Sequence, residues 1–263
     1  MAEPGGTGGP GGTGRTGPLT PAFYARRGGA RWDWWTILHP PYTLWHLSYV
    51  TIGAALAPHV DWLILGATLL AFALAVGVAA HALDEWNGRP LRTSISDRAL
   101  WIAATVSLAG ATALGIATLP HTGPVLIPFV LVGIFLVLGY NLELFGGVLH
   151  TDLGFALAWG AFPAAVGYVA QAPPLNSPSS LGAVIAVLGA TFLSAAQRRL
   201  STPARMLRRR AITVTGVVDL DDGSSVPLDQ ATILGPLDGA LRLLSYATPA
   251  LATAVLLARV PHW

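Results

Sequence analysis

The residues best suited to chemistry end the second long apolar stretch, which reads AHALDE at 80–85. In a helix, His81, Asp84 and Glu85 stand at i, i+3 and i+4 and share one face. Grouped carboxylates hold a hard cation such as Mg²⁺, which binds phosphate oxygens, whereas a histidine favours a softer metal or carries a proton. The segment predicts a metal or phosphate site. The alternative is a helix end whose charges are satisfied by Arg89 or Arg92.

A second polar set follows the fourth apolar stretch and contains Tyr140, Asn141 and Glu143, then His150 and Asp152. If the apolar stretches alternate across a membrane, this set faces the same side as the first. Two polar clusters from separate hairpins then converge on one mouth, which predicts a pocket. For Asp152 the alternative is a place at the start of a helix, favoured by the helix dipole.

The composition leaves few charges from which to build such a site. The chain has 263 residues, is 53% hydrophobic and 11% charged, and has a mean hydropathy of +0.57, whereas a soluble domain is about a quarter charged. A soluble globular protein is therefore excluded. The chain has no cysteine, which excludes disulfides and thiolate chemistry. The basic residues stand in short segments between apolar runs, which argues against nucleic-acid binding.

Seven apolar stretches approach the length of about 20 helical residues that a bilayer requires. They predict an all-α polytopic bundle of about seven transmembrane spans, at 41–58, 61–83, 98–119, 123–142, 152–171, 179–197 and 238–259. Residues 1–30 contain ten glycines and four prolines, which is typical of a disordered tail. The transmembrane domain is then expected over residues 31–263.

The arginines predict the orientation, because short basic loops stay on the cytoplasmic side. All fifteen basic residues are arginines, and alternating spans place fourteen of them on one side and only Arg259 on the other. We therefore expect an integral protein of the cell membrane with a cytoplasmic N-terminus. The basic loop expected at 198–237 also carries β-branched residues around an Asp-Gly pair at about 212–227, which predicts a small cytoplasmic hairpin.

Several segments, in the correct order, resemble the UbiA superfamily of intramembrane prenyltransferases. These are LHPPYTL (38–44), IGAAL (52–56), the run 80–96, Tyr140 with Asn141, LAWGAFP (157–163) and Gly167 with Tyr168. The family ends its second helix with Asn-Asp-x-x-Asp-x-x-x-Asp, followed by an Arg-Pro-Leu-Pro-Ser-Gly-like loop. The four motif positions and the loop correspond here to Ala80, His81, Asp84, Gly88 and RPLRTSIS (89–96). The likeness covers about residues 36–200.

The resemblance implies a UbiA-like transferase in which Mg²⁺ ions hold an isoprenoid diphosphate, whose ionisation leaves an allylic cation for an acceptor of unknown identity. It implies catalytic roles for His81, Asp84, Glu85 and Tyr140, with the first three as metal ligands and Glu143 and His150 as further candidates. The implied substrate-binding residues are Arg89, Arg92, Asn141, Arg198, Arg199, Arg205, Trp45 and Trp159.

The chain departs from the family pattern in two places. Asp84 alone remains of the first motif's acids, with Glu85 beside it, and the expected second acidic motif is the basic run AQRRLSTPAR at 196–205. Arginines there can bind diphosphate directly, or they can simply mark the cytoplasmic flank of a span.

Three other hypotheses remain open on the sequence. The first keeps the scaffold but closes the cation on its own chain, as in a terpene cyclase. The second is a non-enzymatic lipid-binding or carrier protein, since a fold does not fix a function. The third is an enzyme that binds a transition metal through His81, Glu85, Glu143 and His150.

Overall fold

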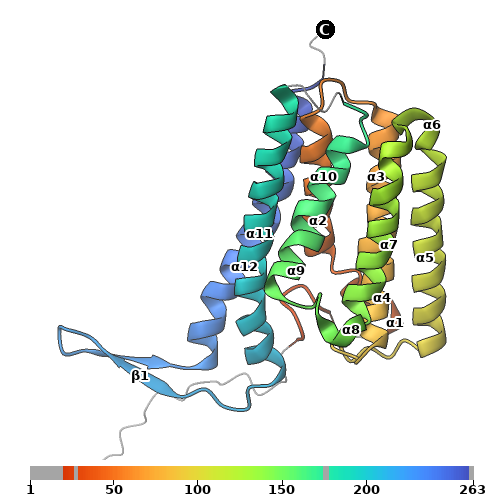
Figure 1. Ribbon diagram of the computed structural model, residues 1–263. Helices are drawn as coiled ribbons and strands as arrows, with labels where there is room; N and C mark the ends of the chain where they lie inside the picture. Colours follow the sequence, from red (N-terminus) through yellow and green to blue (C-terminus); the bar gives the residue numbers. More distant parts are fainter. Residues whose placement is uncertain (1–19, 27–28, 174–177, 261–263) are drawn as a thin grey trace, which may run out of the picture.

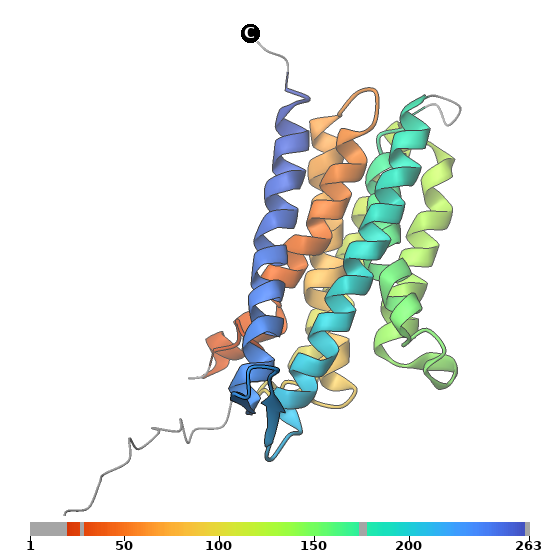
Figure 2. The same cartoon turned by 90° about the vertical axis from the view of Figure 1, so that its left-hand side faces the viewer.

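The computed structural model describes residues 20–26, 29–173 and 178–260. It is a bundle of long helices that stand side by side (Figures 1 and 2). In that described part, six helical stretches are long and apolar enough to cross a membrane: Trp62–Trp86, Asp97–Thr122, Pro124–Asn141, Asp152–Val169, Pro178–Arg209 and Gln230–Leu257. The prediction of an all-α membrane bundle is confirmed.

Two of these stretches contain a π-helix part of the way along. One consists of α3 (Trp62–Phe72), the π-helix η1 (Ala73–Ala80) and α4 (His81–Trp86), and the other of α9 (Asp152–Ala156), the π-helix η3 (Leu157–Ala161) and α10 (Phe162–Val169). Wide π turns are frequent at functional sites. The other helices are α1 (Ala30–Ile37), α2 (Pro40–Ala55), α5 (Asp97–Ala117), α6 (Leu119–Thr122), η2 (Pro124–Leu126), α7 (Ile127–Asn141), α8 (Leu144–Gly147), α11 (Pro178–Arg209) and α12 (Gln230–Leu257).

The first predicted span, 41–58, corresponds to α2, which packs between α10 and α12. It has 16 residues, which at 1.5 Å per residue is about 24 Å and shorter than a hydrocarbon core of about 30 Å. Six spans are therefore supported by their length and composition. The predicted seventh span, α2, stays a prediction.

The end of the sixth span differs from the sequence prediction. Helix α11 continues to Arg209 and α12 begins at Gln230, so the loop predicted at 198–237 is much shorter. The helix continues because Ala204 and Leu207 are buried against Leu234 and Leu241 of α12. Arg198, Arg199 and Arg205 accordingly belong to a helix and not to a loop.

The predicted hairpin is confirmed. Strands β1 (Gly216–Asp219) and β2 (Ser225–Leu228) pair antiparallel, with Val218 opposite Val226. Gly223 in the connecting turn has a φ of 79°, which glycine adopts without a steric penalty. The hairpin projects away from the bundle (Figure 1), so it does not cover the helix ends.

The predicted N-terminal tail lies outside the described residues at 1–19 and 27–28. The intervening residues 20–26 lie against the bundle. Arg208 Nη1 donates to the carbonyl oxygen of Thr20 and Arg209 Nε to that of Pro21, both at 3.2 Å. The Phe23 ring also packs edge-on against Tyr42. The aromatic residues of this segment give it a surface to bury that the preceding glycines lack.

Helices α2 and α10 approach closely at two glycines, an arrangement common where membrane helices pack. A Cβ at Gly167 would lie 2.1 Å from the Val50 oxygen, and one at Gly53 would lie 2.0 Å from the Ala164 oxygen.

Gly167→Ala is expected to destabilise the protein by about 2 kcal/mol, because neither backbone can give way. Thermal unfolding in detergent measures this. Gly189→Ala in α11 is the control, since nothing lies within 4 Å of a Cβ there; equal stability of the two variants would contradict the packing argument.

Candidate functional site

A large polar pocket opens at the end of the bundle that carries α4 and the start of α9. Its volume is about 660 Å³, and its walls come from residues 21–24, α2, η1, α4, α7, α9, η3, α11 and α12. Seven arginines line it: Arg89, Arg92, Arg198, Arg205, Arg208, Arg209 and Arg210. We call this site the basic pocket.

The first predicted cluster is divided between the basic pocket and the protein interior. His81 and Asp84 line the pocket. Glu85 is fully buried, and its carboxylate accepts hydrogen bonds from the backbone N–H groups of Leu91 and Thr93, at 2.9 and 2.8 Å, and from the Thr93 hydroxyl. Glu85 therefore holds the loop after α4, and its predicted role as a metal ligand and catalytic residue does not fit this geometry.

The second predicted cluster meets the first. Tyr140, Asn141, Glu143 and His150 all line the basic pocket with Asp84. The His150 ring stacks on Tyr140 at 4.6 Å between centroids, and its Nδ1 lies 3.7 Å from a Glu143 carboxylate oxygen. The structure thus places both predicted clusters at one mouth.

The donor set does not assemble into a metal centre. Within residues 20–26, 29–173 and 178–260, no three histidine, aspartate or glutamate side chains lie close enough together to hold an ion. Glu85 is occupied by the loop, and Asp238 on the pocket wall pairs with Arg208. The Mg²⁺ site that the family resemblance implies and the four-ligand transition-metal site therefore stay predictions.

Three of the seven pocket arginines, Arg89, Arg198 and Arg208, pair with carboxylates. Arg89 pairs with Asp97 and also donates to the carbonyl oxygen of Ile95. Arg198 pairs with Asp152 at 3.1 Å, which sits in the first turn of α9 behind the Thr151 cap. Arg199 points outward with 82% of its side chain exposed, and it is not part of the pocket lining.

Arg205 and Arg209 are half-buried, and among the described residues neither has a carboxylate oxygen within 4 Å. Arg92 and Arg210 also lack such a partner, but they are exposed. Arg205 donates only a long 3.4 Å hydrogen bond to the Thr202 hydroxyl, and Arg209 donates to the Pro21 carbonyl. They stand one turn apart on α11, and both interact electrostatically with Asp84 across the pocket. Two enclosed cations with so little compensation favour an anionic ligand.

His39 and Tyr24, which line the pocket, are neutral. Desolvation by burial, followed by the charge of His81, lowers the pKa of His39 well below its ordinary value. Burial raises the pKa of Tyr24 well above its ordinary value, and the Tyr24 hydroxyl hydrogen-bonds to His39 Nδ1. His39 and Tyr24 therefore add no charge to the pocket at neutral pH.

Aromatic side chains form the inner wall. Tyr140 packs edge-on against Trp159 at 5.4 Å between centroids, and His46 Nδ1 lies 2.7 Å from the Trp159 carbonyl oxygen. Trp45, predicted to bind substrate, lies outside the pocket lining: it is fully buried and donates through Nε1 to the Tyr49 hydroxyl at 2.6 Å. Helix α2 turns His46 toward the site and Trp45 toward α10 and α11.

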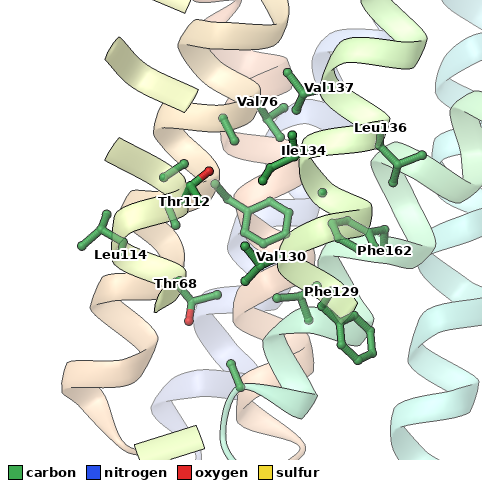
Figure 3. Close-up of a pocket in the computed structure, with 18 of the residues that line it drawn as sticks. Thr68, Val76, Thr112, Leu114, Phe129, Val130, Ile134, Leu136, Val137 and Phe162 are labelled. Carbon is green, nitrogen blue, oxygen red and sulfur yellow. The ribbon is translucent and has the colours of Figure 1, made fainter. Parts of the chain in front are cut away.

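Two apolar spaces adjoin the basic pocket. One is a chamber of about 90 Å³ between α3, η1, α5, α7 and α10, which shares Val76 and Trp159 with the pocket lining; Figure 3 shows Val76, Ile134 and Phe162 around it. The other is a groove of about 360 Å³ between α7 and the α9–α10 stretch, which shares Tyr140 with the pocket. The exposed side chains of Val132 and Leu157 line this groove, so it faces the lipid.

Sequence reasoning missed Arg209, Gln197, His39 and Tyr24. The sequence does contain a pattern that predicts Arg209, because Ser201, Arg205 and Arg209 follow the i, i+4 spacing of one helix face. The pattern was missed because the sixth span was predicted to end at residue 197.

In comparisons with protein-family models, curated proteins and solved structures, no match to the chain was found.

Proposed function

We propose that this protein binds an isoprenoid diphosphate at the membrane surface and transfers its prenyl group to an acceptor. The observation that carries the proposal is the pair Arg205 and Arg209, enclosed in a pocket without carboxylate partners and next to an apolar groove. The UbiA resemblance of the sequence supports the same substrate class.

The diphosphate lies between the arginines of α11 and the end of α4. Guanidinium groups bind phosphate oxygens through paired, charge-assisted hydrogen bonds, so arginines replace the charge that metal ions supply in the family. Asp84 lines the same pocket as Arg205 and Arg209, and its negative charge attracts both. No step of the proposed reaction requires a resident metal.

The hydrocarbon chain follows the groove past Tyr140. The apolar chamber of about 90 Å³ is smaller than the roughly 150 Å³ cavity that holds one benzene, so it takes at most a short part of a prenyl chain. The groove of about 360 Å³ is larger and faces lipid, which allows a chain of any length to extend into the bilayer.

In the reaction the bond between prenyl C1 and the diphosphate oxygen breaks, and its electron pair leaves with the diphosphate. The arginines stabilise the charge that develops on the leaving group. The faces of Tyr140 and Trp159 stabilise the allylic cation. A nucleophilic atom of the acceptor then bonds to C1 and loses its proton to the released diphosphate.

The purified protein should therefore release pyrophosphate from geranyl, farnesyl or geranylgeranyl diphosphate. Absence of release at every chain length, with a panel of acceptors, would overturn the transferase proposal.

The second candidate function is a non-enzymatic lipid-binding or carrier protein, favoured by the lack of a converging carboxylate set in the described chain. A carrier protein should bind the prenyl diphosphate but release no pyrophosphate from it.

Filling the groove should weaken binding of the chain but not of the phosphates. Ala161 lines the groove, and Ala161→Phe is expected to lower affinity for geranylgeranyl diphosphate about tenfold through overpacking, while affinity for inorganic pyrophosphate stays constant. Equilibrium binding with labelled ligands measures both. Leu131→Phe is the control, since Leu131 is exposed and outside the groove lining. Unchanged binding by Ala161→Phe would show that the chain lies elsewhere.

We propose that the basic pocket faces the cytoplasm. The α4–α5 loop and the hairpin lie at the same end of the bundle, and α6 lies at the other (Figure 1). The chain has no cysteine, so single cysteines report orientation directly. In intact cells, a membrane-impermeant maleimide should label His121→Cys in α6 and leave Ser224→Cys in the hairpin unlabelled until the cells are lysed. The reverse pattern would contradict this orientation.

A further inference from the structure

Four buried side-chain atoms of residues that line the basic pocket have no hydrogen-bond partner in the described structure: the Tyr140 hydroxyl, His150 Nδ1, Gln197 Oε1 and Arg208 Nε. His150 lies 3.7 Å from Glu143 and Arg208 pairs with Asp238 through another nitrogen, so the Tyr140 hydroxyl and Gln197 Oε1 are the two that have no such charged neighbour. Their residues are 5% and 2% exposed, and both line the pocket. Buried polar atoms are nearly always hydrogen-bonded, because leaving one unpaired forfeits its hydration without return. Two such atoms on residues that line one cavity favour a ligand that reaches them from it.

The chemistry of the two atoms restricts that ligand. Gln197 Oε1 can only accept a hydrogen bond, whereas the Tyr140 hydroxyl can donate or accept. The ligand must therefore bring an O–H or N–H group. An ionised diphosphate oxygen cannot donate to the amide oxygen, so this place differs from the one beside Arg205 and Arg209.

The surroundings fit an acceptor with an apolar body. The Tyr140 ring contacts His150, Phe155 and Trp159, and Tyr140 also lines the lipid-facing groove. A membrane-soluble molecule entering by the groove thus reaches Tyr140 with its polar end.

We infer that Tyr140 and Gln197 bind the second substrate, a hydroxyl- or amine-bearing molecule that receives the prenyl group on that oxygen or nitrogen. This inference rests on the proposed function. Prenyl C1 loses its bond to the diphosphate, gains a bond to the acceptor heteroatom, and the O–H or N–H proton leaves with the diphosphate. A terpene cyclase would need no hydrogen-bonding subsite here, and unpaired polar oxygens would quench its cation.

Calorimetry on the protein in nanodiscs, with empty nanodiscs subtracted, tests the subsite. The probes are 4-butylphenol and 4-butylaniline, each compared with 4-butylfluorobenzene, which has the same shape but no donor. The wild type is expected to prefer the donor-bearing probes about fivefold, as one buried hydrogen bond allows. Tyr140→Phe and Gln197→Leu should each reduce the preference, and the control Tyr246→Phe, which alters a 69% exposed residue, should not.

The outcomes separate the subsite from the proposed function, because binding of geranylgeranyl diphosphate is measured on the same samples. If the diphosphate binds and the wild type shows no preference, or the variants keep it, the acceptor subsite is overturned. If the preference depends on Tyr140 and Gln197 but the diphosphate does not bind, the proposed function fails while the hydrogen-bonding subsite stands.

Discussion

Arg205→Gln should weaken binding of geranylgeranyl diphosphate about 30-fold or more. The change removes a charge-assisted interaction with the phosphates, each worth about 1.5–3 kcal/mol. It should leave the thermal stability of the ligand-free protein unchanged or slightly higher, because Arg205 is enclosed and makes only the weak bond to Thr202. Equilibrium binding and thermal unfolding of the same preparation measure the two effects.

Arg199→Gln is the matched control for this prediction. It removes the same charge from the same helix, but the Arg199 side chain is 82% exposed and outside the pocket lining. Equal losses of affinity in the two variants would mean that the ligand responds only to the general positive potential. A loss of stability without a loss of affinity in Arg205→Gln would make that arginine a structural residue.

Glu85→Gln should have the largest effect on stability of any single change at this end of the bundle, about 3 kcal/mol. The fully buried carboxylate accepts three hydrogen bonds from the loop at 91–93. An amide at the same place turns one acceptor into a donor that faces N–H groups, which leaves buried polar atoms unpaired. Thermal or denaturant unfolding in detergent measures the loss.

Glu143→Gln serves as the comparison, because the Glu143 side chain is 58% exposed and its loss should cost little stability. At a temperature where Glu85→Gln remains folded, its affinity for geranylgeranyl diphosphate should equal that of the wild type. A stable Glu85→Gln protein that has lost diphosphate binding would restore Glu85 as a member of the site.

The architecture followed from sequence where a pattern is local. Apolar length identified the six long helical stretches, and the Asp-Gly pair between β-branched residues identified the hairpin. The end of α11 did not follow, because the arginine run after residue 197 reads as a loop. Ala204 and Leu207 of this segment pack against α12, which favours its continuation as a helix. The length of α2 also depends on its neighbours α10 and α12.

The candidate site was predictable in its location but not in its division of roles. Alternation of spans brought Asp84, Tyr140 and His150 to one mouth, as the structure places them. The i+4 position of Glu85 suggested the same face as His81, but the loop after α4 folds back and captures it. Nothing in the sequence distinguishes an arginine with a distant partner, such as Arg198 with Asp152, from an unpaired one such as Arg205.

The most direct test of the central claim is equilibrium binding of geranylgeranyl diphosphate to the purified protein in nanodiscs, in the presence of EDTA and beside geranylgeraniol. If the arginines of the basic pocket hold the diphosphate, the diphosphate should bind at least about a hundredfold more tightly than the alcohol, and EDTA should leave its affinity unchanged. Equal affinity for the two ligands, or binding that disappears in EDTA, would contradict this claim.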